Sequence, residues 1–223
     1  MRLQEKLNAF TANAVEKGLP SQSILAKFAK GTKDLIESGQ AERAVKAGDE
    51  APLFNLPDAD GVIFNSRSLL AKGPLVVTFY RGVWCPYCNM DLQALEAARP
   101  EIEYRGASVV ALSMQNASNS RKSRRENHLG FPILLDFKGL VADQFGLRFK
   151  LSDELVDVYK QFGNDLAQVN GEPSWMLPMP ARYVVDQDGV VAYAEVNPDY
   201  TKRPDPSELL TVLNSLKAAR VIA

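Results

Sequence analysis

Residues 75–88 read Leu-Val-Val-Thr-Phe-Tyr-Arg-Gly-Val-Trp-Cys-Pro-Tyr-Cys, and this stretch decides the fold. Leu75–Tyr80 predicts a buried strand. After a short turn, the Cys-Pro-Tyr-Cys segment opens a helix, because apolar residues recur at helical spacing from Met90 to Ala98. Val109–Leu112 predicts a second strand. Strand, helix and strand form a βαβ unit, which should cross over right-handedly onto a central sheet.

The chain beyond this unit continues the alternation of strands and turns. Phe131–Leu135 predicts another strand. Tyr183–Val185 and Val190–Tyr193 flank Asp186-Gln187-Asp188-Gly189, which is a hairpin signal. Asp205-Pro206-Ser207-Glu208 supplies a cap, a proline and an acidic residue in the order that opens a final helix. These elements predict one α/β domain over residues 48–218.

The first 47 residues predict a helical extension. One apolar face recurs at spacings of four and three, at Leu3, Leu7, Phe10 and Ala14. After a break at Gly18-Leu19-Pro20, Ser21 can cap a second helix, whose apolar stripe comprises Ile24, Leu25, Phe28, Leu35 and Ile36. Such a stripe must be buried somewhere. The extension is therefore either a lid folded on the main domain or a dimerisation arm, which keeps a homodimer open.

Composition argues against several functional classes. The 26 basic and 27 acidic side chains nearly cancel, and the one basic run, Arg121–Arg125, is expected to be a solvated helix face. The single histidine, His128, makes an all-protein zinc site hard to assemble. No stretch approaches the ~20 apolar residues that span a bilayer, and the start lacks the apolar run of a secretory signal. We expect a soluble, cytoplasmic protein that binds neither nucleic acid nor membranes and needs no metal or other cofactor.

The only cysteines are Cys85 and Cys88. At the start of a helix, backbone N–H groups and the helix dipole favour negative charge, so Cys85 is expected to be the more acidic and the more exposed thiol. Cys88 lies one turn further on the same face, at a separation that suits a disulfide, and can resolve what forms on Cys85. Half a zinc site and a pair of inert buried cysteines are the competing interpretations. The spacing favours a redox dithiol whose oxidant is either a peroxide or a protein disulfide.

Several motifs resemble a known family. Strand, Trp-Cys-x-x-Cys and helix resemble thioredoxin-fold proteins, and Gly48–Gly61 looks like the opening of the peroxiredoxin branch. Residues 46–218 are similar to peroxiredoxin-like AhpC/TSA proteins with a Tyr-Arg-Gly-x-Trp-Cys-Pro-x-Cys site. The resemblance implies a thioredoxin-like fold, with a central mixed sheet flanked by helices. It also implies a thiol peroxidase with Cys85 as peroxidatic and Cys88 as resolving cysteine, supported by Trp84 and Pro86. Its partners would be a hydroperoxide and a thioredoxin- or glutaredoxin-like reductant.

The chain departs from the typical peroxiredoxin pattern near the cysteines. Typical members place Thr or Ser three residues before the reactive cysteine and Pro seven before it, whereas this chain has Gly82 and Thr78. Typical members also place an arginine six residues before the hairpin aspartate, where this chain has Pro180. We expect Arg81 or Arg182 to hold the sulfur instead.

Pro180 leaves a second activity open. It fits the position of the cis-proline of thioredoxin-like oxidoreductases, which lets a peptide approach the sulfur. The alternatives are therefore a dithiol–disulfide oxidoreductase and a non-enzymatic, redox-switched binding protein. Trp175, Met176 and Met179 form an apolar segment that is either a collar around an organic hydroperoxide or ordinary packing in a core or dimer interface.

Overall fold

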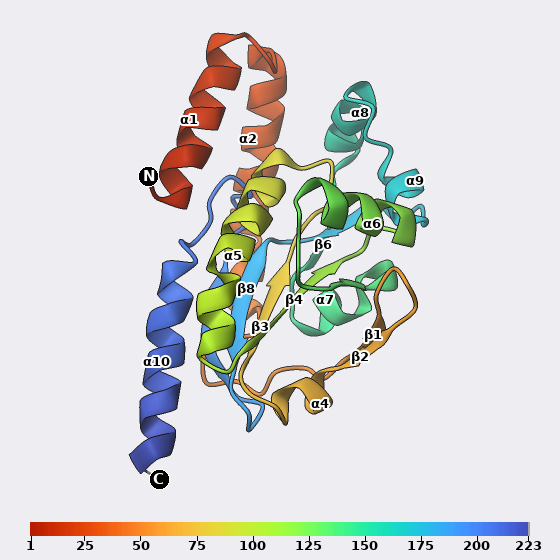
Figure 1. The fold of residues 1–223 in the computed structure, drawn as a ribbon. Coiled ribbons are helices and arrows are strands. Elements are labelled where there is room, and N and C mark those ends of the chain that lie inside the picture. Colours follow the sequence, from red (N-terminus) through yellow and green to blue (C-terminus); the bar gives the residue numbers. More distant parts are fainter. Residues whose placement is uncertain (223) are drawn as a thin grey trace.

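Five strands form the central sheet in a computed structural model that describes residues 1–222 (Figure 1). Their order across the sheet is β5-β4-β3-β8-β9. The strands are β3 (Leu75–Phe79), β4 (Ser108–Ser113), β5 (Ile133–Leu135), β8 (Ala181–Val185) and β9 (Val191–Val196). β3, β4 and β5 run parallel, while β8 pairs antiparallel with both β3 and β9. The predicted mixed sheet of an α/β protein is confirmed.

Helix α5 (Pro86–Tyr104) connects β3 to the parallel strand β4, so the predicted βαβ unit is also confirmed. Its buried positions recur at helical spacing, which turns one face toward the sheet; they are Cys88, Asp91, Leu92, Leu95 and Ile102. Helix α10 (Ser207–Ile222) lies beside α5 (Figure 1). The start of α5 therefore stands at the carboxyl end of β3, with its two cysteines on the covered face.

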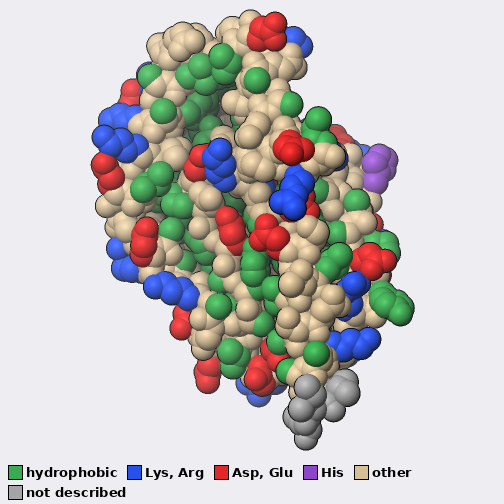
Figure 2. All heavy atoms as spheres, turned by 90° about the vertical axis from the view of Figure 1, so that its left-hand side faces the viewer, with side chains coloured by type: hydrophobic (Ala, Val, Ile, Leu, Met, Phe, Trp, Pro, Cys, Tyr) green, Lys and Arg blue, Asp and Glu red, His purple; other side chains and the backbone are tan. Residues whose placement is uncertain are grey.

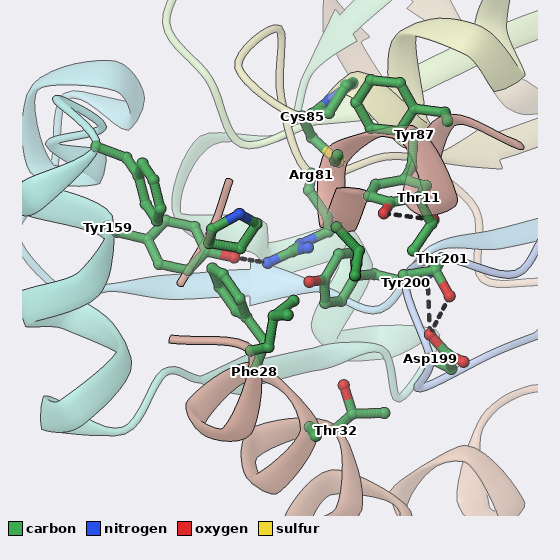
Figure 3. A pocket seen from close by; sticks show the side chains of 18 of the residues that line it. Thr11, Phe28, Thr32, Arg81, Cys85, Tyr87, Tyr159, Asp199, Tyr200 and Thr201 are labelled. Carbon is green, nitrogen blue, oxygen red and sulfur yellow. Dashed lines mark hydrogen bonds between the residues drawn. The ribbon is translucent and has the colours of Figure 1, made fainter. Parts of the chain in front are cut away.

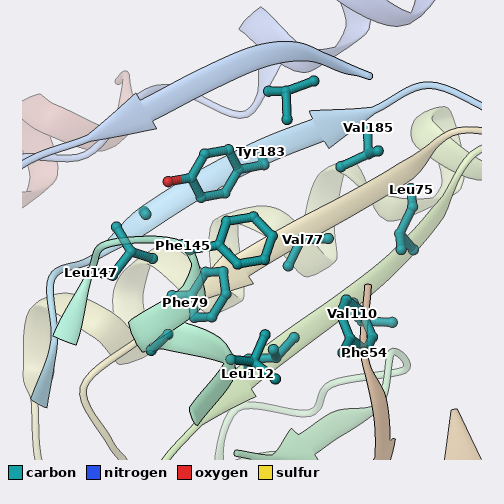
Figure 4. Packing of buried hydrophobic residues seen from close by; sticks show 14 of the residues in the cluster. Phe54, Leu75, Val77, Phe79, Val110, Leu112, Phe145, Leu147, Tyr183 and Val185 are labelled. Carbon is teal, nitrogen blue, oxygen red and sulfur yellow. The ribbon is translucent and has the colours of Figure 1, made fainter. Parts of the chain in front are cut away.

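Both faces of β3 are buried, and its side chains alternate between two clusters. Leu75, Val77 and Phe79 join a cluster centred on Phe145 and Tyr183 (Figure 4). On the opposite face, Val76 and the following Tyr80 pack in the cluster that contains Cys85 and Cys88. The apolar run around β3 thus forms two cores at once, and one of them encloses the dithiol.

Shorter elements complete the fold. Two small antiparallel sheets pair β1 (Asn55–Pro57) with β2 (Ile63–Asn65), and β6 (Arg148–Lys150) with β7 (Met176–Pro178). The remaining helices are α3 (Gln40–Arg43), α4 (Ser66–Leu70), α6 (Ala117–Glu126), the 3-10 turn η1 (Phe137–Gly139), α7 (Leu140–Gln144), α8 (Asp153–Gln161) and α9 (Leu166–Asn170). None of the helices described is long and apolar enough to cross a membrane.

The extension forms a helical hairpin of α1 (Leu3–Glu16) and α2 (Gln22–Glu37), which we call the N-terminal arm. α1 packs on α5 and α2 packs on α8, at the top of the view in Figure 1. Ser21 occupies the cap position of α2, but its side chain makes no capping hydrogen bond. Basic and acidic side chains are interspersed over the face shown in Figure 2, and hydrophobic ones gather toward its upper part. The arm's position agrees with the lid interpretation, whereas the dimerisation alternative and the domain boundary at residue 47 stay predictions.

Candidate active site

A cavity of about 830 Å³ lies between the arm and the start of α5, and Cys85 forms part of its wall (Figure 3). The arm contributes the side that includes Phe10, Thr11 and Phe28. The body of the protein contributes the opposite side, where Arg81, Trp84, Pro86, Tyr87, Tyr159 and Tyr200 lie. Cys88 is not among the described residues that line the cavity. Only one sulfur of the pair therefore faces the space that a substrate can enter.

The two cysteines are reduced and buried, with Cys85 1% and Cys88 0% exposed. Burial raises the pKa of the Cys85 thiol, and its hydrogen bond to the Cys88 sulfur raises it further. Burial acts in the same direction on Cys88, but that hydrogen bond and the charges of Arg203 and Arg81 outweigh it and lower the pKa of Cys88 to about 6. The expectation that Cys85 is the more acidic thiol is wrong, because Cys85 donates the proton that the two sulfurs share. Cys85 is the more exposed of the two, as expected, but only by its place in the cavity wall, since both side chains are buried.

Arg81 lies beside the dithiol, as its proximity in sequence suggested. Arg81 is 3% exposed, and its guanidinium carbon lies 5.0 Å from the centre of the Trp84 ring and 4.2 Å from the centre of the Tyr200 ring. Its Nη2 donates to the Tyr159 hydroxyl (Figure 3). Since the charge of Arg81 lowers the pKa of both thiols, it favours thiolate at this site.

Arg182, the other arginine that the sequence offered for this role, binds Asp91 instead of a sulfur. Its Nη2 lies 2.5 Å from Oδ1 of Asp91, and both side chains are buried. Oδ2 of Asp91 faces Nε of Arg203 at 3.3 Å, and Nη2 of Arg203 donates to the Cys88 sulfur at 3.3 Å. Arg203 is the arginine that touches sulfur, while Arg182 balances the charge of the aspartate behind it.

The indole of Trp84 occupies the space beside Gly82. Gly82 has a φ of +146°, and a Cβ built there would lie 2.5 Å from Nε1 of Trp84. A Thr or Ser side chain is therefore excluded at this position, which gives the missing hydroxyl a physical reason. Nε1 of Trp84 and Nε of Arg81 are buried without a hydrogen-bond partner among the described residues. Buried donors normally have a hydrogen-bond partner, so an oxygen-bearing ligand at this end of the cavity would accept the hydrogen bonds that these two N–H groups lack.

The structure decides two questions that the sequence left open. The peptide bond before Pro180 is trans, since the one cis bond among residues 1–222 precedes Pro20, and Pro180 is buried outside the cavity lining. Trp175, Met176 and Met179 form no collar: Met179 packs in the core, Met176 belongs to β7, and the ring of Trp175 lies under Lys160. The alternative of ordinary packing holds for Met179, and the apolar wall near Cys85 comes from the N-terminal arm instead.

The sequence analysis did not predict four residues that lie at or behind the site, namely Asp91, Tyr159, Tyr200 and Arg203. Asp91 did carry a signal, because a carboxylate on the apolar face of a helix needs a buried cation. Burial raises the pKa of Tyr159 and of Tyr200, so both stay protonated hydroxyls near Cys85. Across the chain as described, no group of three or more His, Cys, Asp or Glu side chains could hold a metal ion. The site is an arginine- and tyrosine-lined dithiol.

The model of the AhpC/TSA family matches residues 47–194. The chain belongs to the AhpC/TSA family. A Mycobacterium tuberculosis protein named as a peroxiredoxin is 31% identical over 114 residues, which cover 51% of this chain and 74% of the relative. Peroxiredoxin Q, chloroplastic, of Oryza sativa subsp. japonica is 28% identical over 172 residues, covering 77% of this chain and 68% of the relative. The crystal structure of peroxidoxin BcpB from Mycobacterium tuberculosis shares the fold, with a TM-score of 0.60 at 23% identity over 77% of this chain and 97% of that one.

These likenesses identify a peroxiredoxin-like protein of the thioredoxin-fold superfamily, and thus an oxidoreductase of the thiol-dependent peroxidase class. The family match begins after the arm and ends before Tyr200 and Arg203. Part of the site of this AhpC/TSA member is therefore built from segments on either side of the matched region.

Proposed function

We propose that this AhpC/TSA protein reduces hydroperoxides at Cys85 and forms an intramolecular disulfide with Cys88. The observation that carries the proposal is the unequal placement of the two sulfurs: Cys85 lines the cavity, and Cys88 lies behind it against Arg203. An accessible sulfur can meet substrate, and a shielded sulfur held as thiolate can meet only its neighbour.

The first step uses the proton shared by the two sulfurs. Cys88, as thiolate, accepts the proton of the Cys85 thiol while the Cys85 sulfur attacks the terminal oxygen of a hydroperoxide ROOH. The O–O bond breaks, Cys85 becomes a sulfenic acid, and the departing RO⁻ takes the shared proton and leaves as the alcohol ROH. The unpartnered N–H groups of Arg81 and Trp84 suit the two peroxide oxygens as negative charge develops.

The second step closes the disulfide. The Cys88 thiolate, regenerated when its proton leaves with the alcohol, attacks the sulfur of the Cys85 sulfenic acid and expels hydroxide, which takes up a proton to become water. The positive charges of Arg203 and Arg81, which lower the pKa of Cys88 in the reduced dithiol, also favour its thiolate for this attack.

A thioredoxin- or glutaredoxin-like dithiol resets the enzyme by exchange. Its thiolate attacks Cys85, the sulfur on the cavity side, and Cys88 leaves as a thiolate. A leaving group of low pKa departs faster, so Arg203 assists this step as well. A second thiol of the reductant then releases Cys85. The homodimer stays a separate prediction that this scheme does not need.

Mass spectrometry of a Cys88→Ser variant after brief exposure to hydrogen peroxide tests the assignment. The expected product is the mass of one added oxygen on Cys85, because the residue that would resolve the sulfenic acid is gone. The Cys85→Ser variant, treated in the same way, should remain unmodified. A dithiol–disulfide oxidoreductase or a non-catalytic redox switch is the better description if Cys85 stays reduced while wild-type protein exchanges rapidly with disulfides, or reacts with neither.

A further inference from the structure

The cavity is far larger than hydrogen peroxide needs. Its volume of about 830 Å³ falls in the range of sites that hold drug-sized ligands. Of the described side chains that line it, Arg81, Lys33 and Asp199 carry charge, and Asp199 accepts hydrogen bonds from the backbone and hydroxyl of Thr201. Most of the wall is apolar or aromatic. Such a space gains affinity from an apolar ligand and adds nothing to the binding of a small polar one.

The cavity has a polar end and an apolar end. Arg81, Cys85 and the hydroxyls of Tyr159 and Tyr200 converge at the polar end (Figure 3). The unpartnered Nε of Arg81 and Nε1 of Trp84 belong to the same end. The arm forms the apolar side, with Phe10, Ala14, Val15, Leu25, Phe28 and Ile36. A molecule with a hydroperoxide head and a long apolar tail matches this polarity along its length.

The arm is fastened where it lines the cavity. Oγ1 of Thr11 lies 2.8 Å from Oη of Tyr87, and the Phe10 ring meets the Tyr87 ring edge-on at 5.4 Å. From α2, the ring of Phe28 contacts the rings of Tyr159 and Tyr200 at 6.1 and 6.2 Å. These contacts hold an apolar wall in place opposite Cys85. The cavity is thus built by the arm as much as by the matched family domain.

We infer that the N-terminal arm is the specificity element of this enzyme, and that its substrates are hydroperoxides of long apolar chains, such as fatty acyl hydroperoxides, rather than hydrogen peroxide. The inference rests on the proposed function and uses the same chemistry at Cys85, with the acyl-chain alkoxide leaving as its alcohol. The apolar tail of the substrate lies along α1 and α2. Burial of its surface stabilises the enzyme–substrate complex and the transition state alike, and so raises kcat/KM.

Steady-state kinetics with a fatty acid hydroperoxide and with hydrogen peroxide test the inference. We expect wild-type kcat/KM to be at least about tenfold higher for the fatty acid hydroperoxide, since burial of a few methylene groups supplies such a factor. Ala29→Phe fills the apolar side of the cavity from an exposed position of α2 and should lower that ratio about fivefold or more, through a loss of kcat/KM for the fatty acid hydroperoxide. Ala26→Phe, an exposed position of the same helix outside the lining, is the matched control and should leave the ratio at its wild-type value.

A product analogue gives an independent reading. A hydroxy fatty acid should inhibit hydrogen peroxide reduction competitively in wild-type enzyme, and at least about fivefold more weakly in Ala29→Phe. Equal kcat/KM for both hydroperoxides in the wild type, or a ratio that Ala29→Phe leaves unaltered, would overturn the arm's role while the peroxidase chemistry stands. If the wild type reduces neither substrate, or the Cys85→Ser variant still does, the proposed function itself fails.

Discussion

Single residues decide how this site handles a peroxide without the family's hydroxyl. The sequence showed that Gly82 lacks it, but not that the indole of Trp84 fills the vacated space. Gly82 and Trp84 depend on each other, because a side chain at position 82 would occupy the space that the indole of Trp84 fills. In this chain an N–H donor stands where relatives of the typical pattern offer an O–H donor.

A Gly82→Ser variant, which restores the typical hydroxyl, should therefore lose activity. The new Cβ would displace Trp84, so we expect the free energy of unfolding to fall by about 1–3 kcal/mol and kcat/KM for peroxide to fall about tenfold. Gly189→Ser is the control, because Gly189 also has a positive φ, +90°, but has open space around it. Chemical denaturation and peroxidase assays check both variants, and a gain of activity in Gly82→Ser would contradict the role given to Trp84.

Arg203 is one of the groups that lower the pKa of Cys88, after the hydrogen bond from Cys85 and together with Arg81. Since the pKa of Cys88 is lowered to about 6, the thiolate is present above that pH and is lost as the pH falls through it. The rate of disulfide formation should thus be level near neutral pH and fall about tenfold for each pH unit well below 6. In Arg203→Gln the midpoint should move upward by about one pH unit, because a positive charge within contact of the sulfur is gone.

Rapid-mixing measurements of disulfide formation against pH check this prediction. Arg203→Lys keeps the charge and should retain most of the wild-type profile, which separates an electrostatic role from a packing role. An unchanged midpoint in Arg203→Gln would assign the lowered pKa of Cys88 to its hydrogen bond with Cys85 and to Arg81 alone.

At the scale of elements, what could be predicted followed from local patterns. The strand, helix and strand around Cys85 are encoded by adjacent residues, and the family motif adds the role of each cysteine. Arg203 could not be predicted, because it lies in a loop more than one hundred residues away and reaches Cys88 only through the packing of that loop on α5. The acidity of the two thiols was misjudged for the same reason: the helix start is a local feature, whereas burial under the arm and contact with Arg203 are not.

The buried ion network of Asp91, Arg182 and Arg203 ties α5 to β8 and to the loop before α10. Asp91→Asn would leave two buried guanidinium groups without their counter-charge, so we expect a loss of about 3–5 kcal/mol in the free energy of unfolding. Asp34→Asn breaks an exposed pair with Lys30 on α2 and should cost no more than about 0.5 kcal/mol. Urea denaturation of both variants measures the difference, and equal losses would show that the network does not hold these elements together.

For the whole molecule, the arm poses a problem of access. Both sulfurs are buried, yet the proposed thioredoxin- or glutaredoxin-like reductant would have to place its own sulfur against Cys85. A hydroperoxide can enter the cavity, whereas a folded domain cannot. Reduction by a thioredoxin-like protein therefore requires the arm to shift away from α5, and the contacts that fasten the arm oppose that movement. The sequence left a lid and a dimerisation arm as alternatives, and the packing of α1 on α5 and of α2 on α8 agrees with the lid.

Tyr87→Phe removes the hydrogen bond that joins α1 to α5. A net hydrogen bond contributes about 0.5–1.5 kcal/mol, so we expect the oxidised variant to be reduced by thioredoxin about two- to tenfold faster than the wild type. Reduction by dithiothreitol, which is small enough to enter the cavity, should be unchanged. Tyr104→Phe, an exposed position on the same helix, serves as the control. Equal rates with thioredoxin for all three proteins would mean that arm movement does not limit reduction.

The position of Trp84 has an optical consequence. The chain has two tryptophans. Trp84 adjoins Cys85 in sequence and lies 5.1 Å from Tyr159 and 5.0 Å from the Arg81 guanidinium. Trp175 lies near Lys160 and packs against the same small hydrophobic cluster as Trp84. Disulfide sulfur quenches indole fluorescence at close range, so the emission of Trp84 should dim when the dithiol is oxidised and brighten when it is reduced. With Trp175 replaced by phenylalanine, the remaining light would come from the active site alone, and each turnover could be followed without an added dye.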